Sequence, residues 1–335
     1  MAESSRQNLF LGLESGGRKI AAAIVDEANR VVSRAEGSRR SGNRAKATLK
    51  QIQNVAEAAL QQLPDAAGSL VAAGWGFGGM VDRKNNQPQV NPHEAGWEGL
   101  SSRTALESAL SLPVHVINDC NAAALAEGHA GAGSLEGTMI YVTLGSGIGG
   151  GALVDGKLLE GGRFGEMELG HLPLDPELLP CPCGNVGCLE STCSGDGLGR
   201  LALHWRERFR NSVLSRELEN RSPEEIAPQL LEPDTRDPLA LACQNHFLEL
   251  LGKAGAILVN LFNPTVLVLG GGVMQNAWLL KPLKAAIHQG VAPQLKASFE
   301  IRSAALQTDV VPLGAALYAR QLAEKTSSPP QPILR

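Results

Sequence analysis

The sequence predicts an α/β protein of two domains, and three observations support this prediction. The chain has 335 residues, which at roughly 150 residues per domain corresponds to about two domains. Short apolar strands alternate with amphipathic helices, as in proteins built on largely parallel sheets. The pattern of strands and glycine turns in residues 8–36 starts again at residue 138, which suggests duplication of one α/β unit.

Composition and charge restrict the class of protein further. Hydrophobic residues make up 43% and charged residues 19% of the chain, which is enough apolar material for a folded core. The net charge is −4, from 30 basic and 34 acidic residues, so the chain lacks the positive charge that nucleic acids and anionic membranes attract. No run approaches about 18 apolar residues, and the start of the chain does not resemble a secretory signal. We therefore expect a cytoplasmic protein that binds neither nucleic acid nor membranes.

The first half of the chain contains the strands and helices of the first predicted unit. We expect three strands joined by tight turns within residues 8–36. A helix is expected over 43–63, because apolar residues recur there at the helical period. Buried strands are expected at 70–77 and 114–117, with a helix at about 101–110 between them.

The second half of the chain also contains sequence signals for the starts of strands and helices. A strand over 138–144 leads into a glycine-rich turn and a second hairpin. Ser222 begins a capping box, with Pro at the next position and Glu three residues later. Asp237 and the Pro after it begin a long apolar helix that ends near Phe262. A strand over 265–269 then enters a third glycine turn.

These elements define the expected domains. Residues 8–117 form a smaller N-terminal α/β domain, which a C-terminal helix at about 312–325 could complete. Residues 118–311 form a larger α/β domain. The segment 326–335 is rich in Pro and Ser, and we expect a disordered tail there.

Three glycine-rich turns follow strands, at residues 14–19, 144–151 and 269–273. Backbone N–H groups in a turn without Cβ atoms can approach and bind an anion, and Lys19 or Ser146 could add side-chain donors. Glycines also serve hairpins and close packing, and none of these turns has the spacing of a P-loop or Rossmann motif. Because two of the turns occupy corresponding places in the repeated unit, we interpret them as phosphate-binding turns for a nucleotide.

Asn118 and Asp119 stand where a buried strand ends and a helix of small residues begins. One interpretation of Asp119 is a helix N-cap, a frequent role for Asp. The other is a general base that accepts a proton from a substrate hydroxyl. The sequence does not decide between them.

The strongest local signal is the spacing H-x9-C-x-C-x4-C, formed by His171, Cys181, Cys183 and Cys188. One imidazole and three thiolates form a closed tetrahedral ligand set for structural zinc. Glu168 and Glu190 flank this segment. They could bind sugar hydroxyls, face solvent, or support His171 as hydrogen-bond partners.

Together these motifs resemble the ROK family (repressors, open reading frames and sugar kinases) over about residues 8–320. The family's acidic residue followed by x-G-G-T-K corresponds to residues 14–19, and its second phosphate turn to residues 144–150. Its Asn-Asp pair corresponds to Asn118 and Asp119. Its E-x-G-H and C-x-C-G-x-x-G-C-L-E signature matches Glu168 to Glu190 without a gap.

The resemblance implies an actin-like, ribonuclease-H-like fold of two domains with a cleft between them, and a homodimer. It also implies transfer of the γ-phosphoryl group of ATP to a hexose or N-acetylhexosamine, with Asp119 as the base. The sugar contacts that it implies are Gly79, Asn91, Asn118, Asp119, Glu168, His171 and Glu190. The contacts with ATP and Mg²⁺ that it implies are Glu14, Gly16, Gly17, Arg18, Lys19, Gly145, Ser146, Gly147, Gly270, Gly271 and Gly272.

Several alternatives remain open at this point. Glucose is the leading substrate, with fructose, N-acetylglucosamine and N-acetylmannosamine as alternatives, the last because the loop at Gly78 and Gly79 resembles that of N-acetylmannosamine kinases. Repressors of the family carry a winged helix before the first strand, for which a strand beginning near Asn8 leaves no room. A catalytically weak sugar-binding protein is the alternative of another class, because Glu14 and Arg18 replace the usual Asp and Thr. We expect Arg18 to face the phosphates rather than Glu14.

Overall fold

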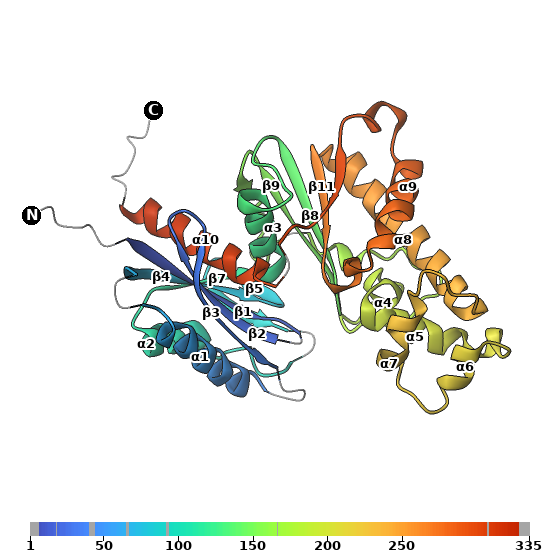
Figure 1. Ribbon diagram of the computed structural model, residues 1–335, viewed down its shortest axis with the longest axis horizontal. Coiled ribbons are helices and arrows are strands. Elements are labelled where there is room, and N and C mark those ends of the chain that lie inside the picture. The colour runs from blue at the N-terminus through green and yellow to red at the C-terminus, as the bar shows by residue number, and fades with distance from the viewer. Residues whose placement is uncertain are drawn as a thin grey trace, which may run out of the picture. The chain divides into compact units, whose positions relative to one another are not determined.

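A computed structural model describes residues 7–17, 19–39, 44–64, 67–91, 94–165, 167–306 and 308–327. Contacts within the chain divide these residues into two compact units. The first unit contains the residues up to Gly131, those from Leu158 to Gly165, and those from Thr308 onward; the rest form the second unit. Each unit is built around one five-stranded sheet (Figure 1).

The sheet of the first unit has the strand order β3-β2-β1-β4-β7. Its strands are β1 (Asn8–Ser15), β2 (Lys19–Asp26), β3 (Val31–Ser38), β4 (Ser69–Phe77) and β7 (Val114–Asn118). The first three strands are antiparallel, whereas β4 is parallel to β1 and β7 is parallel to β4. A small hairpin of β5 (Met80–Asp82) and β6 (Gln87–Val90) follows β4. The carboxyl ends of β1, β4 and β7 therefore meet at one edge of the sheet.

Helices cover both faces of this sheet (Figure 1). They are α1 (Ala45–Gln61), α2 (Ser102–Leu110), α3 (Asp119–Ala130) and α10 (Val310–Ser327). Helix α10 lies so close to the sheet that two strand positions have no room for a Cβ atom. A Cβ atom on Gly12 would lie 1.7 Å from the Pro312 carbonyl oxygen, and one on Gly74 would lie 1.8 Å from the Ala315 carbonyl oxygen. Gly314 allows a similarly close approach between α10 and α3. The glycines in the strands thus have a packing role.

The sheet of the second unit has the strand order β10-β9-β8-β11-β12. Its strands are β8 (Thr138–Leu144), β9 (Ile148–Val154), β10 (Lys157–Leu158), β11 (Val266–Gly270) and β12 (Glu300–Ser303). Strands β8 and β9 form an antiparallel hairpin, and β11 runs parallel to β8 and β12. This order matches that of the first sheet, as the internal repeat in the sequence predicts.

Helices surround the second sheet and extend from it. The α-helices are α4 (Glu190–Cys193), α5 (Gly195–Trp205), α6 (Val213–Glu217), α7 (Pro223–Leu230), α8 (Pro238–Phe262) and α9 (Leu280–Gly290). The 3-10 turns are η1 (Leu169–His171), η2 (Arg206–Phe209), η3 (Gly272–Gln275), η4 (Ala277–Leu279) and η5 (Pro293–Leu295). The capping box at Ser222 and the N-cap at Asp237, followed by Pro238, are both present as predicted.

The predicted strands and helices of the first half are confirmed, and the C-terminal helix is α10. The structural division of the chain falls after Gly131, whereas the sequence predicts a boundary after residue 117, because α3 packs against α10. The predicted tail lies outside the described residues from 328 onward, and α10 continues through Ser327. Among the described residues, no helix combines the length and hydropathy needed to cross a membrane.

Candidate functional site

The first unit gathers its predicted site residues at the carboxyl ends of parallel strands. Ser15 at the end of β1 is paired in register with Phe77 at the end of β4, and Phe77 with Asn118 at the end of β7. Glu14 therefore lies on the same sheet edge as Asp119, which follows Asn118. Edges of this kind are where open α/β sheets bind their ligands.

The first glycine turn connects β1 to β2. The Gly16 N–H donates to the Lys19 carbonyl oxygen at 3.1 Å. The Nζ of Lys19 lies 3.1 Å from Glu14 Oε2 and donates to the Thr308 carbonyl oxygen. Gly17 is exposed, so its backbone is accessible to a ligand. The expected contact from Arg18 falls outside the described residues.

Three carboxylates influence one another beside this turn. Burial raises the pKa of Glu14 to about 7, Lys19 opposes this increase, and Asp119 and Asp309 add to it. A carboxyl group whose pKa is raised mainly by burial and further by nearby acids is favoured in its ionised form when a divalent cation approaches. The residues present therefore fit a Mg²⁺ site, and oxygen ligands are those that Mg²⁺ prefers. The sequence carries no signal for Asp309 at this site, because Asp309 lies far along the chain, directly before α10.

Asn118, rather than Asp119, is the N-cap of α3. The Asn118 Oδ1 accepts hydrogen bonds from Cys120 N at 2.9 Å and Asn121 N at 3.2 Å, and its Nδ2 donates to the Gly79 carbonyl oxygen at 3.3 Å. Asp119 begins the first turn of α3, and its Oδ1 accepts from Cys120 N at 2.8 Å. The interpretation of Asp119 as the N-cap is therefore wrong.

The second carboxylate oxygen of Asp119 faces the glycine loop after β4. A Cβ atom on Gly78 would lie 3.2 Å from Asp119 Oδ2. A Cβ atom on Gly79 would lie 2.4 Å from the Val90 carbonyl oxygen and 3.1 Å from the Asn91 Cα. The absence of a side chain on Gly78 thus keeps the space beside Asp119 open, and its absence on Gly79 lets Asn91 approach the loop.

The second unit contains the second and third glycine turns on one sheet edge. The turn between β8 and β9 is closed by Gly145 N donating to the Gly147 carbonyl oxygen at 2.9 Å. Strand β11 pairs with β8, so that Gly270 lies opposite Thr143. Gly271 has φ +89°, and a Cβ atom there would lie 2.4 Å from the Leu144 carbonyl oxygen. The two turns are therefore adjacent and depend on glycine for both conformation and space.

The Glu190 carboxylate binds the backbone of the second glycine turn. Its Oε2 accepts a hydrogen bond from Ile148 N at 2.7 Å, and a Cβ atom on Gly147 would lie 2.6 Å from the same oxygen. The sequence predicts a sugar contact from Glu190 and carries no signal for this backbone contact. The contact links the end of the segment from Glu168 to Glu190, called the cysteine segment below, to the turn that carries Ser146.

The four predicted metal ligands converge. One atom from each of His171, Cys181, Cys183 and Cys188 lies within 4.8 Å of all the others. The Sγ atoms of Cys183 and Cys188 are 3.7 Å apart, close to the ~3.8 Å expected for two thiolates bound tetrahedrally at about 2.3 Å from one zinc ion. Burial raises the pKa of the Cys188 thiol to about 12, so a cation would be needed to hold it as a thiolate at neutral pH. The donor set and its geometry therefore fit zinc.

His171 presents its two ring nitrogens to different partners. Its Nδ1 lies 3.6 Å from the Cys181 Sγ, inside the cluster. Its Nε2 lies 3.8 Å from the exposed carboxylate of Glu168. One imidazole can thus bind a metal through Nδ1 while its Nε2 remains available to a ligand beside Glu168.

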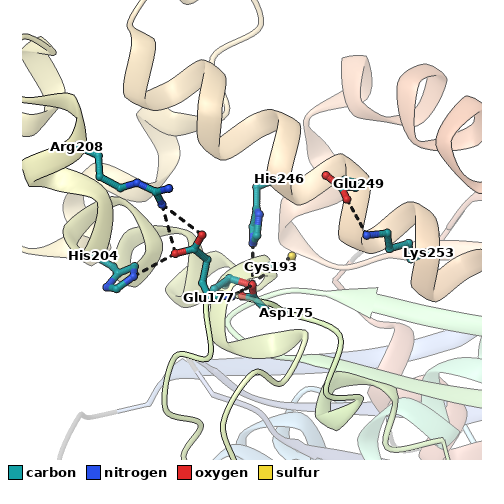
Figure 2. Close-up of polar contacts among 9 residues, drawn as sticks. Asp175, Glu177, Cys193, His204, Arg208, His246, Glu249 and Lys253 are labelled. Atoms are coloured by element: carbon teal, nitrogen blue, oxygen red, sulfur yellow. Dashed lines mark hydrogen bonds and ion pairs between the residues drawn. The ribbon is translucent and has the colours of Figure 1, made fainter.

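Two acidic residues anchor the cysteine segment to neighbouring helices (Figure 2). The buried Asp175 lies 3.2 Å from His246 Nε2 on α8. Glu177 lies 3.2 Å from His204 Nε2 and 3.3 Å from an Arg208 nitrogen. The sequence carries no signal for either contact, because an isolated acidic residue does not indicate a partner on a distant helix.

The two units have sheets of matching strand order, and in each sheet a glycine turn follows the first strand. This duplicated arrangement is the actin-like two-domain fold. The chain belongs to the ROK family, whose family model matches residues 10–322. It is 30% identical over 316 residues to a glucokinase of Halalkalibacterium halodurans, covering 93% of this chain and 95% of the relative.

Solved structures agree with this assignment. A ROK family glucokinase from Streptomyces griseus, solved with glucose and AMPPNP, superposes with a TM-score of 0.77 at 29% identity and covers 93% of this chain and 99% of the other. A ROK hexokinase from Thermus thermophilus superposes with a TM-score of 0.75 at 32% identity, covering 95% and 99%. The ROK assignment and the fold expected from the sequence are both confirmed.

Proposed function

We propose that the protein is an ATP-dependent sugar kinase that transfers the γ-phosphoryl group of ATP to a hexose, with glucose as the leading substrate. The observation that carries this proposal is the Asp119 carboxylate beside the open glycine loop, on the same sheet edge as the first glycine turn. Similarity to glucokinases over nearly the whole chain supports the same substrate class.

In this proposal Asp119 accepts the proton of the sugar hydroxyl as that hydroxyl attacks the γ-phosphorus. Phosphoryl transfer depends mainly on positioning and charge stabilisation, which backbone turns, cations and one base can supply. The nucleotide contacts proposed are Glu14, Gly16, Gly17, Arg18, Lys19, Gly145, Ser146, Gly147, Gly270, Gly271 and Gly272. Mg²⁺, when bound near Glu14, would supply positive charge to the phosphate oxygens.

The sugar contacts that we propose are Gly79, Asn91, Asn118, Asp119, Glu168, His171 and Glu190. Zinc held by His171, Cys181, Cys183 and Cys188 would fix the orientation of the imidazole. The His171 Nε2 would then be available to a sugar hydroxyl, so the metal would act on sugar binding without touching the sugar.

The two compact units are proposed as the two domains of the kinase. The family resemblance also supports a homodimer. Light scattering during size-exclusion chromatography tests that assembly directly.

One observation favours a second candidate, a sugar-binding protein with weak catalysis. Lys19 lies 3.1 Å from Glu14 Oε2, and an ion pair there would compete with Mg²⁺ for the carboxylate. The two candidates differ in turnover but not in sugar binding.

A coupled ADP-release assay with ATP and Mg²⁺ separates them. Glucose, mannose, fructose, N-acetylglucosamine and N-acetylmannosamine are each supplied as acceptor. The proposal predicts sugar-dependent ADP release that is fastest with glucose. Sugar binding by calorimetry, without ADP release above the sugar-free rate for any acceptor, would favour the second candidate.

A further inference from the structure

A buried arginine connects the first glycine turn to the residues around Asn91. Arg39 follows β3, and its side chain is 8% exposed. One terminal nitrogen donates to the Gly16 carbonyl oxygen at 2.7 Å. The other lies 2.8 Å from Glu94 Oε2, and the Glu94 side chain is only 1% exposed.

Glu94 is itself held from several directions. The Trp97 Nε1 donates to its Oε2 at 2.8 Å, and the Thr48 hydroxyl on α1 donates to its Oε1. Its backbone N–H donates to the Asn91 carbonyl oxygen at 3.1 Å, and the two residues form an isolated antiparallel bridge. The position of Asn91 therefore depends on where Glu94 is held.

The same connection continues to the loop beside Asp119. The rings of Trp97 and Phe77 are 4.9 Å apart, and Phe77 directly precedes Gly78 and Gly79. Continuous contacts thus lead from the Gly16 carbonyl through the Arg39 guanidinium and the Glu94 carboxylate to Asn91. None of these contacts involves a proposed metal ligand of the cysteine cluster.

A contribution to stability does not by itself explain the buried pair of Arg39 and Glu94. Two buried charges are often no more stabilising than well-packed apolar residues of similar volume, because both must be removed from water. A planar guanidinium, however, can hold two acceptors at fixed positions with separate nitrogens, which neither a lysine nor an apolar side chain can do. The geometry suits the alignment of two segments.

We propose that Arg39 and Glu94 are positioning residues that couple nucleotide binding at the first glycine turn to sugar binding at Asn91. This inference rests on the proposed sugar kinase function, which assigns the phosphates to Gly16 and the sugar to Asn91. A phosphate that orders the turn fixes Gly16, and Arg39 transmits that position to Glu94. Each substrate then favours the binding of the other, as reciprocal linkage requires.

The test compares three proteins by calorimetry. The Kd for glucose is measured without nucleotide and with a saturating non-hydrolysable ATP analogue and Mg²⁺. Arg39→Lys retains the charge but offers one nitrogen in place of two separate ones, so it cannot hold both acceptors at the same positions. Asp26→Asn is the matched control, because it breaks the pair between Arg30 and a carboxylate that is 1% exposed, at the opposite end of β2 from the glycine turn.

We expect the ATP analogue to tighten glucose binding by the wild type at least about fivefold, the lower end of typical couplings. In Arg39→Lys this factor should fall close to one, while Asp26→Asn should lower the melting temperature and keep the wild-type factor. If Arg39→Lys does not fold, the double variant Arg39→Met with Glu94→Gln, which removes both charges, is measured in its place.

The outcomes separate the two proposals. A wild type that binds no sugar contradicts the proposed function and removes the basis of this inference. A wild type that binds both ligands without coupling, or an Arg39 variant that keeps the full coupling factor, overturns this inference alone. A loss of melting temperature without a change in coupling would show that the pair only stabilises the fold.

Discussion

The Nζ of Lys19 lies 3.1 Å from Glu14 Oε2 across the first glycine turn. This ion pair joins the first residue of β2 to the buried residue Glu14 near the end of β1. It gives Glu14 a partner other than Arg18, so Arg18 is not needed to balance the charge of Glu14. The expectation that Arg18 faces the phosphates remains a prediction.

Glu14 should make stability depend on pH in a characteristic direction. Without Mg²⁺ or nucleotide, its pKa is about 7 in the folded protein and 4.5 in the unfolded chain. Between these values the folded protein holds a proton that the unfolded chain has lost. The free energy of unfolding should therefore fall as pH rises from about 4.5 to about 7, by up to about 3 kcal/mol, and Glu14→Gln should lack this decrease. Urea unfolding of both proteins at several pH values measures the difference.

Asp26→Asn provides a control of opposite sign. Burial favours a higher pKa for Asp26, but hydrogen bonds from Arg30 and Ala28 outweigh burial and lower the pKa. The stabilisation from Asp26 should be present at neutral pH and be lost as the pH falls below the ordinary pKa range of an aspartate.

A difference in the free energy of unfolding between the wild type and Glu14→Gln that does not change between pH 5 and pH 8 would contradict the assigned pKa of Glu14.

Metal analysis of the purified protein should find one zinc per chain. Cys183→Ser removes one of four ligands and should lower zinc content, because structural zinc sites require the full ligand set. The Kd for glucose should rise more than the Kd for ATP, since the same segment carries two proposed sugar contacts, His171 and Glu190. Cys243→Ala, which removes a buried thiol of α8 outside the cluster, should leave zinc content unchanged. Folded wild-type protein without zinc would show that the cluster has another role.

The contact between Asp175 and His246 should control how firmly zinc is retained (Figure 2). Asp175→Asn weakens the anchor of the cysteine segment on α8, and we expect zinc transfer to a chelator at least several-fold faster with the zinc content unchanged. Glu249→Gln is the matched control, because it removes an exposed pair with Lys253 on the same helix, and such pairs contribute little. Equal transfer rates for the two variants would mean that Asp175 does not restrain the metal.

The sequence predicted those features that local pattern determines. Strands, helices, the cap at Asp237 and the convergence of Cys181, Cys183 and Cys188 follow from periodicity, capping chemistry and ligand spacing within short segments. The family's motifs added the fold, which composition alone could not specify.

What the sequence did not predict are contacts between distant segments. The bond from Arg39 to Gly16, the pairing of Arg39 with Glu94 and the anchor of Asp175 on His246 depend on tertiary packing. A charged residue has no periodic partner in the sequence, so its burial and its partner become visible only when the sheet has formed. The same reason explains why α3 lies in the first unit: its packing on α10 joins residues almost two hundred positions apart.

The most direct test of the central claim is to identify the product formed with and without the Asp119 carboxylate. Wild-type protein with ATP, Mg²⁺ and glucose is followed by ³¹P NMR, and Asp119→Asn is followed in parallel at matched glucose saturation. We predict that the wild type forms a sugar phosphomonoester, and that Asp119→Asn binds glucose with a similar Kd but forms the product at least about a hundredfold more slowly. Near-normal product formation by Asp119→Asn would contradict the account, because Asp119 could not then be the base.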